Sequence, residues 1–271
     1  MTTCPECMSF RIKKYGWRKN KRGLFQKYKC KSCGKQFIDD DFLWMQTPKE
    51  VVAFAIRLWR RGLRPSWIVQ EIRIVYRIER SVYALFYWIK KFLDLFKFIN
   101  NIPLVGISER LHWDYTYIKI SGKDAYLWVL KDSLKKFVVG WIITTTKTLK
   151  DAKASLFAAK KHFLPNYQLK EIVSDGEQSF PRAIWEVFNH AVKHYRYKGF
   201  RDKKNNNLIE ELWRLKNHIP EFRTIEQAER FFTIWVAFYN VEKSLQARKI
   251  EMISNLEKIT IFQPIFTIQV L

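Results

Sequence analysis

The sequence lacks the features that mark several common protein classes. It has no run of about 18 apolar residues, the length that crosses a membrane, because Lys or Arg interrupts its longest apolar stretches. The N-terminus has no apolar stretch resembling a signal peptide, and the 271 residues contain no internal repeat or low-complexity tract. We therefore expect a cytoplasmic protein, and its length predicts two or three folded units.

Acidic residues are scarce relative to basic ones. Lys and Arg number 49 against 26 Asp and Glu, which gives a formal net charge of +23 and a pI near 9.9. Residues 11–35 contain no acid, and their bases are Arg11, Lys13, Lys14, Arg18, Lys19, Lys21, Arg22, Lys27, Lys29, Lys31 and Lys35. This stripe predicts a polyanionic partner. Nucleic acid fits it, although an anionic membrane surface would also attract it.

Cysteine is also rare, and its four residues form two tight pairs. Cys4 pairs with Cys7 and Cys30 with Cys33, and 22 residues separate the pairs. In a reducing compartment this is zinc-ribbon spacing, because each Cys-x-x-Cys turn aims two thiolates at one point. Four free, buried cysteines are the alternative. A zinc ion held by four thiolates is closed to water, so we expect one structural Zn²⁺.

Helical periodicity replaces the cysteine pattern from Thr47 to Phe92. A first helix is expected near Pro48, a second, short one around Ile68 and Ile72, and a third entered through Arg80 and Ser81. The apolar stripe of the third helix consists of Leu85, Trp88, Ile89 and Phe92. Three short helices with a basic last member predict a helix-turn-helix DNA reader, and a generic helical linker is the alternative.

The remainder alternates between β-rich and helical segments. Three β-rich runs come first, 111–120, 125–130 and 137–145. Then follow a helix over 152–163, a strand over 171–174, a helix over 180–188, a strand over 191–197, and helices over 208–217 and 225–240. The order βββαβαβα is that of the RNase H-like α/β fold. The last ten residues are apolar and are expected to form a strand or a dimer contact.

Three acids stand out within this unit. Asp114 lies inside the first strand, Asp175 ends the fourth strand, and Glu210 lies in the first turn of the helix after the fifth. These three places converge in an RNase H-like sheet. Carboxylates in one small volume raise each other's pKa unless cations lie between them, and ligands that are all oxygen favour Mg²⁺ or Mn²⁺.

Each acid also has a structural interpretation. Asp114 could face water at a strand edge, and Asp175 before Gly176 is an ordinary turn dipeptide. Glu210 follows Asn207 by three residues, a spacing that caps a helix. Glu211 competes with Glu210, but it projects about 100° away around the helix.

The segments around these acids resemble a known family. Residues 114–117 (DYTY), 174–176 (SDG) and 206–210 (NNLIE) are similar to the acidic triad of bacterial and archaeal insertion-sequence transposases of the DDE class. The 34 residues between Asp175 and Glu210 are typical of these transposases and of retroviral integrases. Residues 222–240 resemble the helix that closes their catalytic domain. The resemblance covers residues 110–245, and a zinc ribbon with a helix-turn-helix is a usual N-terminal companion.

The sequence departs from the family pattern at two positions. Many relatives carry an acid directly after the first Asp, where this chain has Tyr115. Relatives also tend to carry Lys or Arg seven residues after the Glu, where this chain has Asn217. The nearest bases are Arg214 and Lys216, and Arg214 shares the helix face of Glu210.

The resemblance implies DNA cleavage and strand transfer by two Mg²⁺ or Mn²⁺ ions, bridged by Asp114 and each held by Asp175 or Glu210. It implies double-stranded DNA as partner, both as terminal inverted repeats and as target. It also implies a homodimer or larger assembly, no membrane partner, and a prokaryotic, nucleoid-associated location. The expected domains are 1–45 (zinc ribbon), 46–100 (helix-turn-helix), 101–246 (catalytic) and 247–271 (tail). The expected DNA contacts are Lys13, Lys14, Arg18, Lys19, Lys21, Arg22, Arg80, Arg214 and Lys216.

Two other functions compete with transposition. A DNA-binding regulator derived from a transposase would keep the fold without cutting, and the intact triad argues against it. A nuclease of the same fold would hydrolyse DNA or RNA without joining ends. The zinc ribbon and the helix-turn-helix favour specific DNA ends over general hydrolysis.

Overall fold

The computed structural model describes residues 4–7, 9–20, 23–38, 45–102, 104, 106–175, 177–197, 209, 212–213 and 219–246. Between Phe54 and Ala55 the chain divides into two compact units, a smaller N-terminal unit and a larger one. No helix within the described ranges is both long enough and apolar enough to span a bilayer.

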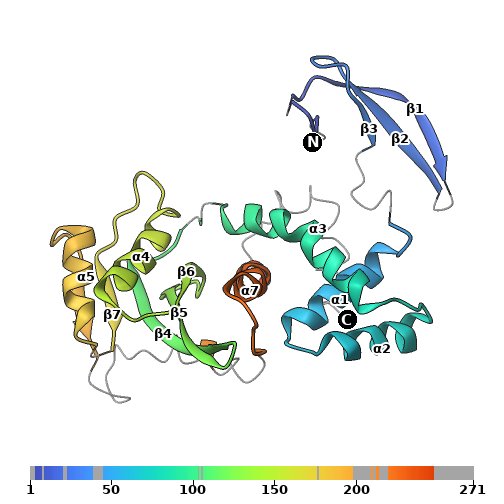
Figure 1. Ribbon diagram of the computed structural model, residues 1–271. Helices are drawn as coiled ribbons and strands as arrows, with labels where there is room; N and C mark the ends of the chain where they lie inside the picture. The colour runs from blue at the N-terminus through green and yellow to red at the C-terminus, as the bar shows by residue number, and fades with distance from the viewer. Residues whose placement is uncertain are drawn as a thin grey trace. The chain divides into compact units, whose positions relative to one another are not determined.

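The N-terminal unit is built on a small antiparallel sheet in the order β1-β2-β3 (Figure 1). Its strands are β1 (Ile12–Asn20), β2 (Gly23–Cys30) and β3 (Gln36–Ile38). Among the described residues between 4 and 38, only Cys4 and Cys30 are buried. The sheet therefore has no apolar core, and a module of this size needs a staple such as a metal ion. This arrangement is compatible with the predicted zinc ribbon.

Three helices follow the sheet, as the periodicity predicted. They are α1 (Lys49–Arg60), α2 (Pro65–Tyr76) and α3 (Val82–Asn100). Ser81 caps α3 by accepting a hydrogen bond from the Ala84 amide at 3.3 Å. The prediction of a short second helix was wrong: α2 has 12 residues and continues until Arg77, whose left-handed φ of 54° ends it. The use of α3 as a DNA reader stays a prediction.

The larger unit contains a five-stranded mixed sheet in the order β6-β5-β4-β7-β8 (Figure 1). Its strands are β4 (Arg110–Ile120), β5 (Lys123–Asp132), β6 (Val138–Thr144), β7 (Glu171–Ser174) and β8 (Lys193–Arg196). The first three strands form an antiparallel meander, and β7 and β8 run parallel to β4. This topology is the predicted RNase H-like fold.

Helices cover both faces of this sheet (Figure 1). They are α4 (Leu149–Lys160), α5 (Ser179–Phe188) and α7 (Ile225–Gln246). Under α4 and α5, Trp113 stacks on Phe180 with ring centroids 4.0 Å apart, whereas Ile118 belongs to the core under α7. Side chains alternate along a strand, so the odd-numbered residues of β4 face α4 and α5 and the even-numbered ones face α7.

Two close contacts fix the helices on the sheet. At Gly140 in β6 an added methyl group would lie 2.5 Å from the Cα of Ala159 in α4, so only glycine allows this approach. On the other face, the Asn240 side chain in α7 bonds both the backbone N–H and the C=O of Val138, at 2.8 and 2.9 Å. The helix predicted to close the catalytic domain is therefore hydrogen-bonded to the edge strand β6 through this side chain.

Several predicted boundaries were wrong by a few residues. The helix expected over 152–163 begins at Leu149, because Thr148 and Asp151 form a capping box ahead of it. The strand expected over 191–197 is limited to β8, and the last helix extends to Gln246. Most of the helix predicted over 208–217, and the tail 247–271, lie outside the described residues.

Candidate active site

Two predicted site residues, Asp114 and Asp175, come from neighbouring parallel strands, since Asp114 lies within β4 and Asp175 directly follows β7. The last register pair is His112 with Val173, and continuing this spacing for two residues would bring Asp114 opposite Asp175. Ile172 faces the core under α4 and α5, so Asp175, three residues on, shares the opposite face with Asp114. Neighbouring strands lie about 4.8 Å apart, so these two half-buried carboxylates are neighbours on the α7 side of the sheet.

The Asp114 carboxylate accepts hydrogen bonds at both of its oxygens. Trp213 donates from Nε1 to Oδ2 at 3.0 Å, and the Tyr115 backbone amide donates to Oδ1 at 2.8 Å. In both bonds an N–H group donates to a carboxylate oxygen. They also fix the direction in which its remaining lone pairs point.

Asp175 lies in the turn that follows β7. Its Oδ1 accepts a hydrogen bond from the Glu177 amide at 3.2 Å. The preceding residue, Ser174, is fully buried and contacts His194 in β8, with Oγ and Nε2 2.8 Å apart. Burial and the nearby Arg196 lower the pKa of His194, and the Asp175 charge opposes them. His194 is therefore neutral at pH 7.

Three polar side chains meet beside the two aspartates. Lys147, which lies between β6 and α4, donates from Nζ to the Tyr115 hydroxyl and to Glu177 Oε2, both at 2.9 Å. The Tyr115 hydroxyl also donates to Glu177 Oε2, at 3.2 Å. Desolvation raises the pKa of Tyr115 to about 12, and the hydrogen bond from Lys147 lowers the pKa of Glu177. At neutral pH the cluster contains a neutral phenol, a carboxylate and an ammonium.

Part of the predicted site lies outside the described residues. These positions are Glu210, its competitor Glu211, and the predicted DNA contacts Lys21, Arg22, Arg214 and Lys216. Trp213, which bonds to Asp114, is three residues beyond Glu210 in the sequence. The role of Glu210 therefore stays a prediction.

Sequence reasoning missed three residues that contact this site. Glu177 follows Asp175 by two residues, and that proximity was its only signal. Trp213 lies one helical turn after Glu210, a spacing at which two residues share a face. Lys147 gave no signal, because it lies 32 residues from Tyr115 in a chain rich in lysine.

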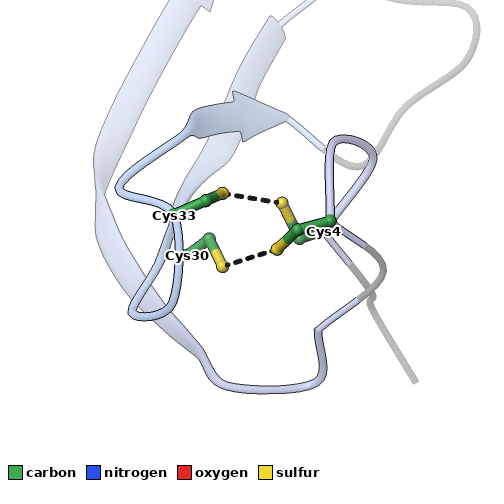
Figure 2. A group of neighbouring side chains, drawn as sticks. Cys4, Cys30 and Cys33 are labelled. Carbon is green, nitrogen blue, oxygen red and sulfur yellow. Dashed lines mark hydrogen bonds between the residues drawn. The ribbon is translucent and has the colours of Figure 1, made fainter.

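The four cysteines form a separate cluster in the N-terminal unit, with their Sγ atoms all within 4.8 Å of one another. The Sγ atoms of Cys4 and Cys33 are 3.5 Å apart, and those of Cys7 and Cys30 are 3.6 Å apart. A tetrahedral zinc ion with Zn–S bonds of about 2.3 Å needs sulfur separations of about 3.8 Å, so the cluster fits zinc. Figure 2 shows Cys30 and Cys33, at and after the end of β2, facing Cys4.

Backbone amides donate hydrogen bonds to one sulfur of this cluster, that of Cys30. The amides of Cys33 and, at 3.3 Å, Ser32 donate to the Cys30 sulfur and lower the pKa of Cys30 to about 6. Metal ions bind the thiolate form, so this turn favours coordination near neutral pH.

The predicted DNA contacts that are described lie at the surface or close to it. Those in β1 are all exposed, and they are Lys13, Lys14, Arg18 and Lys19. Arg80, just before α3, is half-buried and donates to the Glu79 carbonyl at 2.6 Å. Their contact with DNA stays a prediction.

The aspartates line neither of two cavities of about 400 Å³ in the larger unit. One cavity lies at the other end of β4, beside Ser108, Arg110 and Lys170. The other lies between the end of α1 and α7, beside Arg60 and Trp235.

Comparison with known families gives one match. A family model described as a DDE domain matches residues 108–247, slightly more than half of the chain. This range contains Asp114, Asp175 and Glu210. No curated protein matches the chain.

Solved retroviral structures are among the matches. One is a simian T-cell lymphotropic virus intasome in complex with PP2A regulatory subunit B56 gamma, which is 17% identical with a TM-score of 0.34. That match covers 49% of this chain and 48% of the other. The HTLV-2 integrase catalytic core domain in complex with magnesium matches in a trimeric form (15% identity, TM-score 0.30) and a dimeric form (16%, 0.31). Each covers 41% of this chain and 65% or 66% of the other, so this chain spans about half to just under two thirds of their lengths.

Proposed function

This chain belongs to the DDE domain family of transposases, and from that premise we propose that it cuts DNA at the ends of a mobile element and joins those ends to target DNA. The observation that carries the proposal is the parallel pairing of β4 and β7, whose last register pair, His112 with Val173, lies two residues before Asp114 and Asp175. We assign the third acidic position to Glu210, and the bond between Trp213 and Asp114 supports this choice.

The carboxylates suit a hard divalent cation. Two neighbouring carboxylates on one sheet face repel each other, and their oxygens are the ligands that Mg²⁺ and Mn²⁺ prefer. Asp114 would hold both ions of a two-metal site, and Asp175 and Glu210 would each hold one. When bound, the ions would activate water or a DNA 3′-hydroxyl and stabilise the leaving oxygen.

The protein's own residues would orient this site. Trp213 and the Tyr115 amide hold the Asp114 carboxylate, and the Glu177 amide holds that of Asp175. Hydrogen bonds of this kind orient carboxylates that act as metal ligands. The reacting DNA phosphate would lie over Asp114 in β4 and the carboxyl end of β7, on the α7 side of the sheet.

We assign end recognition to the N-terminal segments. The zinc-bound sheet would present the exposed bases of β1 to DNA phosphates, and α3 would read base edges in the major groove. Joining two element ends requires at least two catalytic sites, so we propose a homodimer or a larger assembly on DNA.

The proposal is tested with DNA from both flanks of the gene, which should contain inverted repeats bounded by short direct repeats. We expect Asp114→Asn, Asp175→Asn and Glu210→Gln each to lower Mg²⁺-dependent strand transfer by about 10³-fold or more, because each removes a metal ligand. Binding to the repeat DNA, measured by mobility shift, should be unchanged.

Glu211→Gln is the matched control and should keep wild-type activity. Loss of activity in Glu211→Gln but not in Glu210→Gln would move the third ligand by one residue. End binding without cleavage by the wild-type protein would instead indicate a transposase-derived regulator. Cleavage without joining would indicate a nuclease.

A further inference from the structure

The backbone ladder between β4 and β7 ends short of the two aspartates. Its register pairs run from Arg110 with Glu171 to His112 with Val173, and β7 itself ends at Ser174. The ladder that spaces these strands thus stops two residues before Asp114 and two residues before Asp175. Another set of contacts is needed to fix the separation of the two carboxylates.

Tyr115, Lys147 and Glu177, which we call the strand-end clamp, supply such contacts. Lys147 Nζ bonds the Tyr115 hydroxyl and Glu177 Oε2, both at 2.9 Å, and the hydroxyl bonds the same oxygen at 3.2 Å. Tyr115 belongs to β4 and Glu177 follows β7. The clamp therefore joins the middle of β4 to the segment after β7, directly beyond the last register pair of the two strands.

The same two residues hold the aspartates through their backbones. The Tyr115 amide donates to Asp114 Oδ1 at 2.8 Å, and the Glu177 amide donates to Asp175 Oδ1 at 3.2 Å. A continuous path of hydrogen bonds and short covalent links thus connects one carboxylate to the other. A shift of the clamp changes the separation of the carboxylates.

Burial and ring packing make the clamp firmer than a surface ion pair. The Lys147 and Glu177 side chains are 31% and 23% exposed. The Tyr115 ring packs against Trp128 with centroids 4.9 Å apart, and odd-numbered Tyr115 faces α4 and α5. The clamp is therefore anchored in the core on the face opposite the carboxylates, where it does not obstruct metal or DNA.

We infer that Tyr115, Lys147 and Glu177 are positioning residues that set the separation of the Asp114 and Asp175 carboxylates and thereby the affinity of the site for Mg²⁺. This inference rests on the proposed function. The Glu177 Oε2 accepts hydrogen bonds from both Lys147 and Tyr115, so this oxygen belongs to the clamp. Tyr115, where many relatives have an acid, is part of this clamp.

The test compares two similar ion pairs on the same unit. Lys153 and Glu186 join α4 to α5 at 2.8 Å, with side chains 34% and 24% exposed, and neither belongs to the clamp. Mg²⁺ binding to the full-length protein is measured by calorimetry for the wild type, Lys147→Met, Lys147→Arg and the control Lys153→Met. Strand transfer is measured against Mg²⁺ concentration for the same variants.

We expect Lys147→Met to weaken Mg²⁺ binding and to raise the Mg²⁺ concentration for half-maximal strand transfer by about 10-fold, the order found for residues that orient metal ligands. Lys147→Arg should recover most of the affinity because it keeps the cation. Lys153→Met should bind Mg²⁺ as the wild type does, with a similar loss of thermal stability.

Unchanged Mg²⁺ affinity in Lys147→Met, or an equal loss in Lys153→Met, would overturn the inference. The direct binding measurement separates this outcome from a failure of the proposed function. A wild-type protein that binds Mg²⁺ but joins no DNA would refute transposition, while the dependence of Mg²⁺ affinity on Lys147 would still decide the role of the clamp.

Discussion

Trp213 shows how one side chain outside the acidic residues can control the site. Its indole N–H donates to Asp114 Oδ2 at 3.0 Å. A donor to a carboxylate both favours the charged form and fixes the orientation of the ligand. Trp213 also joins the stretch of sequence that carries Glu210 to the strand that carries Asp114.

We predict that Trp213→Phe lowers Mg²⁺-dependent strand transfer by about 10-fold, because it keeps an aromatic ring but removes the only donor of the indole. The lost bond should cost about 1.5 to 3 kcal/mol in the free energy of unfolding, measured with urea. Trp185→Phe is a suitable control, since Trp185 lies in α5 and is 48% exposed. Equal activity of Trp213→Phe and wild type would show that this bond does not orient Asp114.

At the scale of residues, sequence patterns point to the acids more readily than to their neighbours. Asp114 and Asp175 stand out because one lies inside a β-rich run and the other ends one, and the fold pairs the two strands. Their role as metal ligands stays a prediction. Lys147 could not be found, because its bonds to Tyr115 and Glu177 depend on where the loop before α4 crosses the sheet. The spacing of residues along the sequence does not predict a hydrogen bond between side chains that only the folded chain brings together.

At the scale of elements, most of the predicted strands and helices follow from the pattern of apolar residues and from the residues that form turns. The meander of β4, β5 and β6 follows from β-branched and aromatic runs, and Ser121 and Gly122, both with positive φ, form the tight turn between β4 and β5. The start of α4 was misplaced because the capping box of Thr148 and Asp151 was overlooked. Apolar periodicity locates the middle of a helix, and its cap determines the end.

The N-terminal sheet depends on its metal more than on its packing. Removing zinc with a chelator should unfold β1 to β3. Among the described residues of this sheet no apolar side chain other than cysteine is buried, so packing there would not replace about 10 kcal/mol or more of metal-binding free energy. The RNase H-like unit should keep its thermal stability. Amide chemical shifts, or the protease sensitivity of the N-terminal segment, would report this difference.

The same treatment should abolish binding to the terminal repeats while leaving Mg²⁺ binding intact. Cys30→Ser is the matching variant, since Cys30 is one of the two buried thiols. If the zinc-free protein bound its DNA ends normally, the N-terminal sheet would have no part in end recognition.

At the scale of the whole molecule, the two compact units divide the proposed work. The cysteine cluster is complete within the N-terminal unit, and Asp114 and Asp175 lie within the larger one. In the larger unit α7 contacts the sheet on one side and α3 on the other, where the Asn100 side chain donates to the Thr233 carbonyl at 2.8 Å. The proposed reading helix is thus attached to the catalytic sheet through α7.

Composition gives an expectation for the class of partner but none for this connection. A net charge of +23 indicates a polyanion wherever the bases lie, whereas the contact of α3 with α7 depends on side chains far apart in sequence, such as Phe96 and Phe238 with ring centroids 5.6 Å apart.

The central claim is that Asp114 and Asp175 together hold the catalytic cation. Crystals of the protein grown with Mn²⁺ test it most directly, because the anomalous signal of manganese locates the ion independently of activity. We expect an anomalous peak for manganese about 2.1 Å from oxygens of both carboxylates, and we expect this peak to disappear in Asp175→Asn. Manganese that binds elsewhere and contacts neither aspartate, under conditions that support strand transfer, would contradict it.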